Sequence, residues 1–208
     1  MADLHCYSYV EDEPSRDVLI KMVQDRNARN HNEVCFLAGF PKVTRGNQRI
    51  QAMCQNFLEM SKFGVYTITL TDLDIMPCAP QLIRKWFFAG KKVPVNLPSQ
   101  VIFRIAVREI ESWILADRAA WAKYIGIPAS NFSPTPEALD DPKKHIFNVL
   151  RRKGNTKKTH GMLPQGSAHI GPTYNSVICD FIRNHWSVRR AREKAPSLQK
   201  AMAALERL

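Results

Sequence analysis

Two aspartates at the end of an apolar run are the residues of this chain best suited to do chemistry. Residues 65–74, VYTITLTDLD, alternate β-branched with larger apolar residues and end at Asp72 and Asp74. The pattern predicts a buried strand, and ligands of open α/β sheets bind beyond the carboxyl ends of strands. Two crowded acids ionise together only when a cation or a shared proton separates them. Carboxylate oxygens suit Mg²⁺ or Mn²⁺, so this segment predicts a metal site.

Further acids follow two other predicted strands. Glu11 stands between the first strand and Asp12 and Glu13, and Glu109 and Glu111 follow the fourth strand. A parallel sheet would bring these acids to one edge, so we expect Glu109 or Glu111 to join the metal site. Acids at a helix start are also stabilised by the helix dipole, which is the alternative role for Glu13 and Glu109. Residues two apart on a helix point about 200° apart, so only one of the fourth-strand pair can face the site if both lie in the helix, and Glu109 is the first choice.

The elements that would position these acids alternate between strand and helix. Apolar, β-prone runs at 4–10, 34–40, 65–71 and 100–107 predict four strands, with a polar loop at 42–47. Helical periodicity follows each strand, at 14–25, 48–63, 77–88 and 108–124. This order predicts an α/β fold with a four-stranded parallel sheet flanked by helices.

A proline-rich and serine-rich segment, 130–142, divides the chain into two predicted parts. Residues 1–128 would form the α/β core. Residues 129–208 would form a helical, basic extension packed on that core, with helices at 142–152, 171–186 and 196–208.

The overall charge favours a polyanionic partner. The 208 residues carry a formal net charge of +11, concentrated in the second half, and this balance favours nucleic acid over a small neutral substrate. No segment has the length and apolarity of a membrane span or the pattern of a secretory signal. Five scattered cysteines without paired spacing are typical of reduced thiols, so we expect a cytoplasmic protein.

Basic residues in two regions are candidates for holding phosphates. Lys42 and Arg45 follow the second strand, on the same edge as the acids. The segment 153–161 is predicted to be an exposed loop. It either grips the substrate or is an ordinary surface loop. The second region supplies Lys143, Lys144, Arg151, Arg152, Lys153, Lys157 and Lys158.

Two further side chains in predicted helical segments have neighbours of an unexpected kind in the sequence. Asp117 lies on an apolar helical stripe, where a buried pair with an arginine is the expected role. Trp186 lies among arginines and is the one tryptophan with a setting suited to stacking on a base.

These residues resemble a known family. VEDEP at 10–14 and TDLDIMPC at 71–78 resemble the Toprim domain, in which a glutamate after the first strand and a DxD after the third bind divalent metal. IAVREIESWILAD at 105–117 is similar to a bacterial Toprim-like family of unknown function, often encoded beside an ABC-type ATPase and suspected in phage defence. The glycine that usually follows the glutamate is Asp12 here, which leaves Glu11 or Glu13 for that role, and alignment favours Glu11. The resemblance implies Glu11 as the acid/base or metal-linked glutamate and Asp72 and Asp74 as ligands.

The sequence thus predicts a Mg²⁺- or Mn²⁺-dependent nuclease that hydrolyses DNA or RNA, with an ABC-type ATPase as partner. Acid-bound Mg²⁺ supplies the charge stabilisation and activated water that phosphodiester cleavage needs. No tyrosine here suggests a covalent intermediate, so hydrolysis is preferred. A non-catalytic subunit that binds nucleic acid and an ATPase, and a phosphoryl-transfer enzyme acting on a small nucleotide, are the alternatives. A homo-oligomer also stays open.

Overall fold

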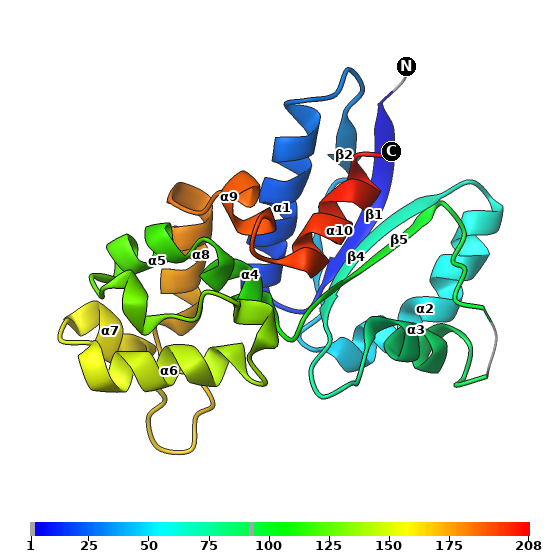
Figure 1. Cartoon of the computed structure of the whole chain (residues 1–208). Helices are drawn as coiled ribbons and strands as arrows, with labels where there is room; N and C mark the ends of the chain where they lie inside the picture. The colour runs from blue at the N-terminus through cyan, green and yellow to red at the C-terminus, as the bar shows by residue number, and fades with distance from the viewer. Residues whose placement is uncertain (1–2, 92–93) are drawn as a thin grey trace.

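Five parallel strands form one sheet in the computed structural model, which describes residues 3–91 and 94–208 (Figure 1). The described strands are β1 Leu4–Val10, β2 Val34–Phe36, β3 Lys42–Val43, β4 Tyr66–Asp72 and β5 Val101–Ala106. Their order is β2-β1-β4-β5, and every strand pair is parallel. The predicted α/β class with a parallel sheet flanked by helices is therefore confirmed.

The second predicted strand, 34–40, is wrong in length, because the chain leaves the sheet after Phe36. Phe40 N–H donates to the Leu37 carbonyl in a turn, and Gly39 takes a positive φ of 81° that suits glycine. The chain then returns beside the same edge of β1 as β3, where Tyr9 and Val10 pair with Lys42 and Val43. The predicted loop at 42–47 therefore begins with a short strand, which fixes the chain that follows against the end of β1.

Helices lie on both faces of the sheet and beyond its carboxyl end (Figure 1). They are α1 Glu13–Asn27, α2 Asn47–Lys62, α3 Ala79–Phe87, α4 Ile110–Ala116, α5 Arg118–Ile125, α6 Pro142–Lys153, α7 Lys157–Met162, α8 Tyr174–Asn184, α9 Val188–Arg192 and α10 Pro196–Leu205. Two short 3₁₀ turns, Ala129–Asn131 and Pro136–Ala138, lie between α5 and α6. None of the helices in the described ranges combines the length and the apolarity needed to cross a bilayer.

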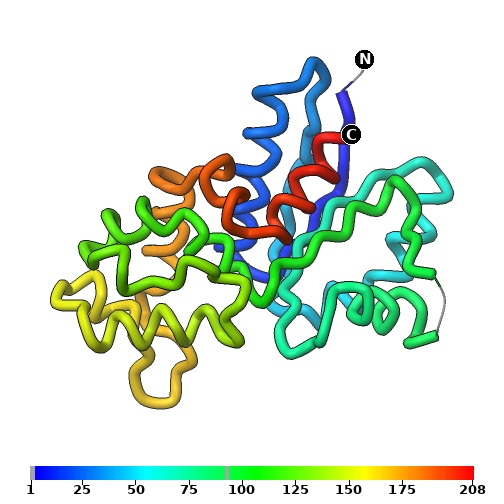
Figure 2. Tube along the Cα trace, in the orientation of Figure 1, coloured from blue at the N-terminus to red at the C-terminus, as the bar shows by residue number. Residues whose placement is uncertain are grey.

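Successive side chains of β5 point to opposite faces of the sheet, and a separate apolar core lies on each face. Ile102 and Ala106 belong to the core that includes α1 and the C-terminal helices, whereas Phe103 and Ile105 face α2 and α3. The first core runs from β1 through Leu205, so it joins residues of both predicted parts of the chain. In Figure 2 the trace of α10 returns to lie beside α1 over the sheet. The C-terminal region is thus helical and packs on the α/β core.

The single helix predicted for 108–124 is wrong. Two helices, α4 and α5, meet at Asp117, whose backbone takes φ −86° and ψ 54° and so departs from helical geometry. The Asp117 carboxylate accepts hydrogen bonds from the Arg190 guanidinium at 2.8 Å on each oxygen and from Ser187 N–H at 2.9 Å. The expected pairing of Asp117 with an arginine is confirmed, and it connects the junction of α4 and α5 to the start of α9.

The segment predicted as an exposed loop at 153–161 contains the helix α7. Thr156 caps that helix, because its hydroxyl accepts from Thr159 N–H at 3.1 Å and Thr159 Oγ1 accepts from Thr156 N–H at 3.0 Å. Gly154 leaves no room for a side chain, since a Cβ there would lie 2.6 Å from the Leu150 carbonyl oxygen. The turn between α6 and α7 is therefore tightly packed.

Candidate functional site

Glu11 extends from the end of β1 to the end of β4. Its Oε1 accepts a hydrogen bond from Asp72 N–H at 2.9 Å and another from the Thr71 hydroxyl. The side chain therefore lies along the carboxyl edge of the sheet instead of crossing it. Glu13 lies in the first turn of α1, where its charge suits the helix dipole. These contacts favour Glu11 over Glu13 as the acid that acts with the β4 aspartates.

Asp72 and Asp74 connect the sheet edge to the starts of two helices. Asp72 Oδ1 accepts from Ile110 N–H at 2.9 Å, the first residue of α4. Asp74 has a positive φ of 51°, which aspartate tolerates better than most residues. Its N–H donates to the Arg108 carbonyl, and its Oδ2 accepts from Asn47 Nδ2 at the start of α2, both at 2.9 Å. Both acids are thus held at fixed positions by elements that begin at this edge.

Glu109 and Glu111 both contact Lys143 of α6. Lys143 Nζ lies 3.8 Å from Glu109 Oε1 and 3.3 Å from Glu111 Oε1, and Lys143 N–H donates to Glu109 Oε2 at 3.1 Å. The condition under which only one of the two glutamates could face the site, that both lie in the helix, is not met. Glu109 precedes α4 in extended backbone, with φ −135° and ψ 163°, so helical geometry does not separate the two.

Lys143 therefore occupies the acidic site, away from the basic surface to which the sequence assigned it. Although burial opposes its charge, Glu111, Glu109 and Asp72 together raise the pKa of Lys143 above its ordinary value. No pattern in the sequence indicates this contact, because Glu109 and Lys143 are 34 positions apart and come from different predicted parts of the chain.

Tyr174 is a second residue of the site that sequence reasoning did not assign. Its hydroxyl donates to Glu111 Oε1 at 3.0 Å, and both side chains are buried. Within the part of the chain that the structure describes, Glu111 Oε2 is buried with no hydrogen-bond partner. Burial and the Glu111 charge raise the pKa of Tyr174 well above its ordinary value, so the tyrosine stays a proton donor at neutral pH.

Three acids of the site, Glu11, Asp72 and Glu109, have pKa values above their ordinary values. Burial is the largest cause for each of them, and it raises the pKa of Glu11 and that of Asp72 despite hydrogen bonds to Glu11. The charges of Glu11 and Glu111 raise the pKa of Asp72 further. Burial and Glu111 raise the pKa of Glu109 to about 7, although Lys143 opposes the shift. A bound cation would relieve the repulsion between these acids, which is the smaller part of the shifts.

Basic groups lie beside these acids at the start of α2. A cavity of about 290 Å³ is lined by Glu11, Asp12, Glu13, Val43, Arg45 and Gly46. A second hollow, of about 400 Å³, continues along Arg45, Gly46, Asn47, Gln48 and Arg49. Arg45 is common to both, and Arg49 extends the basic rim in a way the sequence analysis missed. Lys42 is exposed on β3, next to this rim.

The remaining predicted phosphate-binding residues lie on α6 and α7. Exposed side chains there are Lys144, Arg151, Arg152, Lys153, Lys157 and Lys158. Arg151 and Arg152 line a hollow of about 340 Å³ with His145 and Asn148. The Lys158 ammonium lies 3.9 Å from the centre of the Tyr124 ring, a cation–π contact. Trp186 does not belong to this surface, because it is 4 % exposed and donates to the Trp113 carbonyl at 3.0 Å. Its suggested role in base stacking is therefore wrong.

The chemistry of the donors suits a hard cation, but the ligands are not yet gathered around one point. In residues 3–91 and 94–208, no three Asp, Glu, His or Cys side chains stand in the geometry of a metal site. Glu11 accepts its hydrogen bonds on Oε1 and Asp72 on Oδ1, which leaves the second oxygen of each carboxylate for another ligand. Cation binding would require these carboxylates to move closer together. The charge of the cation would offset their mutual repulsion and so favour this movement.

Comparison of the chain with protein-family models, with curated proteins and with solved structures gave no match.

Proposed function

We propose that this protein is a metal-dependent phosphodiester hydrolase that acts on nucleic acid. One observation carries the proposal: Glu11 of one strand end contacts Asp72 of another, with Asp74 two residues beyond, at the carboxyl edge of a parallel sheet. This edge is where open α/β sheets bind their ligands. Carboxylates at such an edge are typical of a divalent-cation site.

Glu11, Asp72 and Asp74 would hold the cation. Bound Mg²⁺ or Mn²⁺ would stabilise charge on the non-bridging phosphate oxygens and lower the pKa of an attacking water. Glu109 and Glu111, which the sequence also nominated as ligands, contact Lys143 and Tyr174, so the protein already balances much of their charge. We therefore assign the cation to the first three acids, with Glu109 and Glu111 as residues that keep Lys143 at the edge.

The other groups at the edge would bind substrate and hold protons. Arg45 and the start of α2 line the cavity beside Glu11, where a guanidinium and a helix N-terminus suit a phosphate. Glu109, with a pKa near 7, can give up or take a proton at neutral pH. The exposed basic side chains of α6 and α7 would then contact the polymer at a distance from the reacting phosphate.

The resemblance to Toprim domains supports the same assignment. The family's glutamate and DxD correspond to Glu11, Asp72 and Asp74, and Glu11 accepts a hydrogen bond from Asp72 N–H at the sheet edge. By that resemblance we also propose an ABC-type ATPase as a partner and a role in defence against phage.

Cleavage assays with purified protein test the proposal. Labelled single-stranded DNA, double-stranded DNA, tRNA and mRNA are incubated with Mg²⁺, Mn²⁺ or EDTA, with and without the proposed ATPase partner. We expect metal-dependent cleavage by the wild type and none by Asp72→Asn. The matched control is Glu59→Gln, which removes an acid that is exposed on α2 and paired with Lys62. Equal cleavage by wild type and Asp72→Asn would remove the metal mechanism.

The position of Lys143 favours a second candidate function, in which the protein is a subunit that binds nucleic acid without cleaving it. An ammonium group that already contacts two acids of the edge can take the place of a second cation. That reading predicts nucleic-acid binding with no cleavage under any metal, and no Mn²⁺ binding in a calorimetric titration. Mn²⁺ binding that Asp72→Asn abolishes would instead favour the hydrolase.

A further inference from the structure

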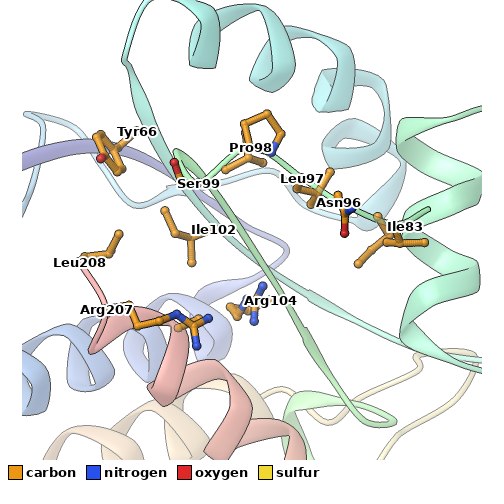
Figure 3. Close-up of a pocket in the computed structure, with 13 residues that line it drawn as sticks. Tyr66, Ile83, Asn96, Leu97, Pro98, Ser99, Ile102, Arg104, Arg207 and Leu208 are labelled. Carbon is orange, nitrogen blue, oxygen red and sulfur yellow. The ribbon is translucent and has the colours of Figure 1, made fainter. Parts of the chain in front are cut away.

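A cavity at the opposite end of the sheet brings two arginines together. It measures about 630 Å³ and lies at the amino ends of β4 and β5. Six residues of extended strand separate Tyr66, in its wall, from Asp72, or about 20 Å. The cavity is therefore separate from the acidic edge. Its lining comes from the starts of both strands, from residues 95–99 that precede β5, and from the end of α10 (Figure 3).

Arg104 stands where the sheet would ordinarily place an apolar residue. It lies between Ile102 and Ala106 on the face of β5 that packs on α10, and both neighbours belong to the apolar core. Its Nε is buried and has no hydrogen-bond partner within residues 3–91 and 94–208. A buried guanidinium without an acceptor is unfavourable unless something binds it.

Arg207 adds a second positive charge to the same wall. Figure 3 shows the two guanidinium groups on one side of the cavity, across from Leu97 and Pro98. Burial and the charge of Arg207 both lower the pKa of Arg104, as expected for two cations that face each other. Across the described part of the chain, neither arginine forms an ion pair with an acid.

The charge of the pair limits the ligand that would satisfy it. Two guanidinium groups carry two positive charges, which a monocarboxylate would only half balance. A phosphate monoester carries between one and a half and two negative charges at pH 7 and offers three oxygens to the planar donors of arginine. The rest of the wall mixes apolar side chains, such as Ile83, Leu97 and Ile102, with the polar groups of Tyr66, Asn96 and Ser99. A volume of about 630 Å³ falls within the range of small-molecule sites.

We propose that this cavity binds a small phosphate monoester with an apolar or planar body, such as a nucleoside monophosphate, with Arg104 and Arg207 holding the phosphate. Ile83, Leu97 and Ile102 contact the body of the ligand. This site does not depend on the function proposed for the acidic edge.

Calorimetric titration in EDTA with adenosine monophosphate, adenosine and inorganic phosphate tests the proposal. Wild-type protein is expected to bind the monophosphate best, with adenosine and phosphate each at least about tenfold weaker. Arg207→Gln should weaken monophosphate binding by about tenfold or more, because a hydrogen bond to a charged group is lost. Arg207 is exposed, so this variant keeps the fold, and Arg104→Gln gives the same comparison from inside the cavity.

Two control variants make the result specific. Lys200→Gln removes one exposed positive charge from the same helix, α10, outside the cavity, and should bind the monophosphate like the wild type. Asp72→Asn should also bind it normally, which separates this site from the acidic edge. Equal affinity in wild type and Arg207→Gln would overturn the proposal. Equal affinity for adenosine and its monophosphate, or binding only of a 5′-phosphorylated oligonucleotide, would overturn the ligand class.

Discussion

At the scale of single residues, Asp72 has the most crowded electrostatic setting at the sheet edge. It is half-buried, and Glu11 and Glu111 add like charge beside it, so ionisation of this carboxyl opposes folding. Its hydrogen bond from Ile110 N–H requires only one acceptor oxygen. A neutral side chain of the same shape can therefore keep the local structure while it removes the charge.

We predict that Asp72→Asn abolishes metal-dependent cleavage and does not lower stability in metal-free buffer. The amide oxygen of asparagine can still accept from Ile110 N–H, and the repulsion from Glu11 is removed. Cleavage assays and thermal unfolding in EDTA at pH 7.5 measure the two effects. Asp74→Asn should also abolish cleavage. A clear drop in melting temperature for Asp72→Asn would mean that the ionised carboxylate stabilises the fold.

Glu109 makes stability depend on pH. Its pKa is about 7 in the folded protein and 4.5 ordinarily, so the folded state binds more protons between these values. Its contribution is full below pH 4.5 and is lost as pH rises through about 7, a decrease of up to about 3 kcal/mol. Urea unfolding in EDTA at pH 5 and pH 7.5 should show this decrease, and Glu109→Gln should reduce it. An unchanged pH dependence in that variant would assign the effect to other acids.

At the scale of elements, Lys143 joins α6 to α4. Its ammonium and its backbone N–H contact acids at the start of α4, and Glu111 has a side chain only 3 % exposed. α6 therefore does more than cover apolar surface, because it supplies the positive charge that the start of α4 lacks. Lys144, the next residue, is exposed and forms no ion pair among the described residues.

We predict that Lys143→Gln lowers the free energy of unfolding by roughly 1–3 kcal/mol at pH 7.5, because it leaves Glu111 buried without a cation. Lys144→Gln is the matched control and should change it by less than about 0.5 kcal/mol. Adding Glu111→Gln to Lys143→Gln should recover much of the stability. Urea denaturation measures all four proteins. Equal effects of the two single lysine variants would show that the contact with Glu111 does not stabilise the protein.

At the scale of the whole molecule, the net charge of +11 is distributed between different roles. Lys143 compensates acids, Arg190 pairs with Asp117, and Arg183 pairs with Asp17. The lysine and arginine side chains of α6 and α7 other than Lys143 are exposed and so accessible to an outside partner. A salt titration can show whether that partner is a nucleic acid.

We predict that neutralising the exposed basic residues of α6 weakens nucleic-acid binding and reduces its salt dependence. For each phosphate that the protein no longer neutralises, the slope of log affinity against log salt should fall by roughly 0.7–0.9. The variant changes Lys144, Arg151, Arg152 and Lys153 to glutamine and retains Lys143, because Lys143 contacts Glu109 and Glu111. Binding titrations between about 50 and 300 mM salt, over which the Debye length changes by about 2.5-fold, provide the measurement. An unchanged slope would indicate that these charges serve solubility or contact a protein.

The sequence by itself determined the class of fold, most element boundaries and the acids at the strand ends. The repeat of apolar residues every two residues in a strand, or every 3.6 in a helix, is a local property of the sequence. The ends of β1, β4 and β5 were therefore predicted to within one or two residues. The acids that follow these strands were also evident, because parallel strands place their ends at one edge. The same local reasoning placed Asp117 with an arginine, since a buried carboxylate needs a partner.

Only the tertiary structure decided which distant residues meet. The contact of Lys143 with Glu109 and Glu111, the hydrogen bond from Tyr174, and the pairing of Arg104 with Arg207 join segments that are 32 to 103 positions apart. Periodicity says which face a residue occupies on its own element, but not which element packs against that face. The break at Asp117 escaped prediction for the same reason, because α4 and α5 share a continuous helical pattern and only the contact with α9 ends the first.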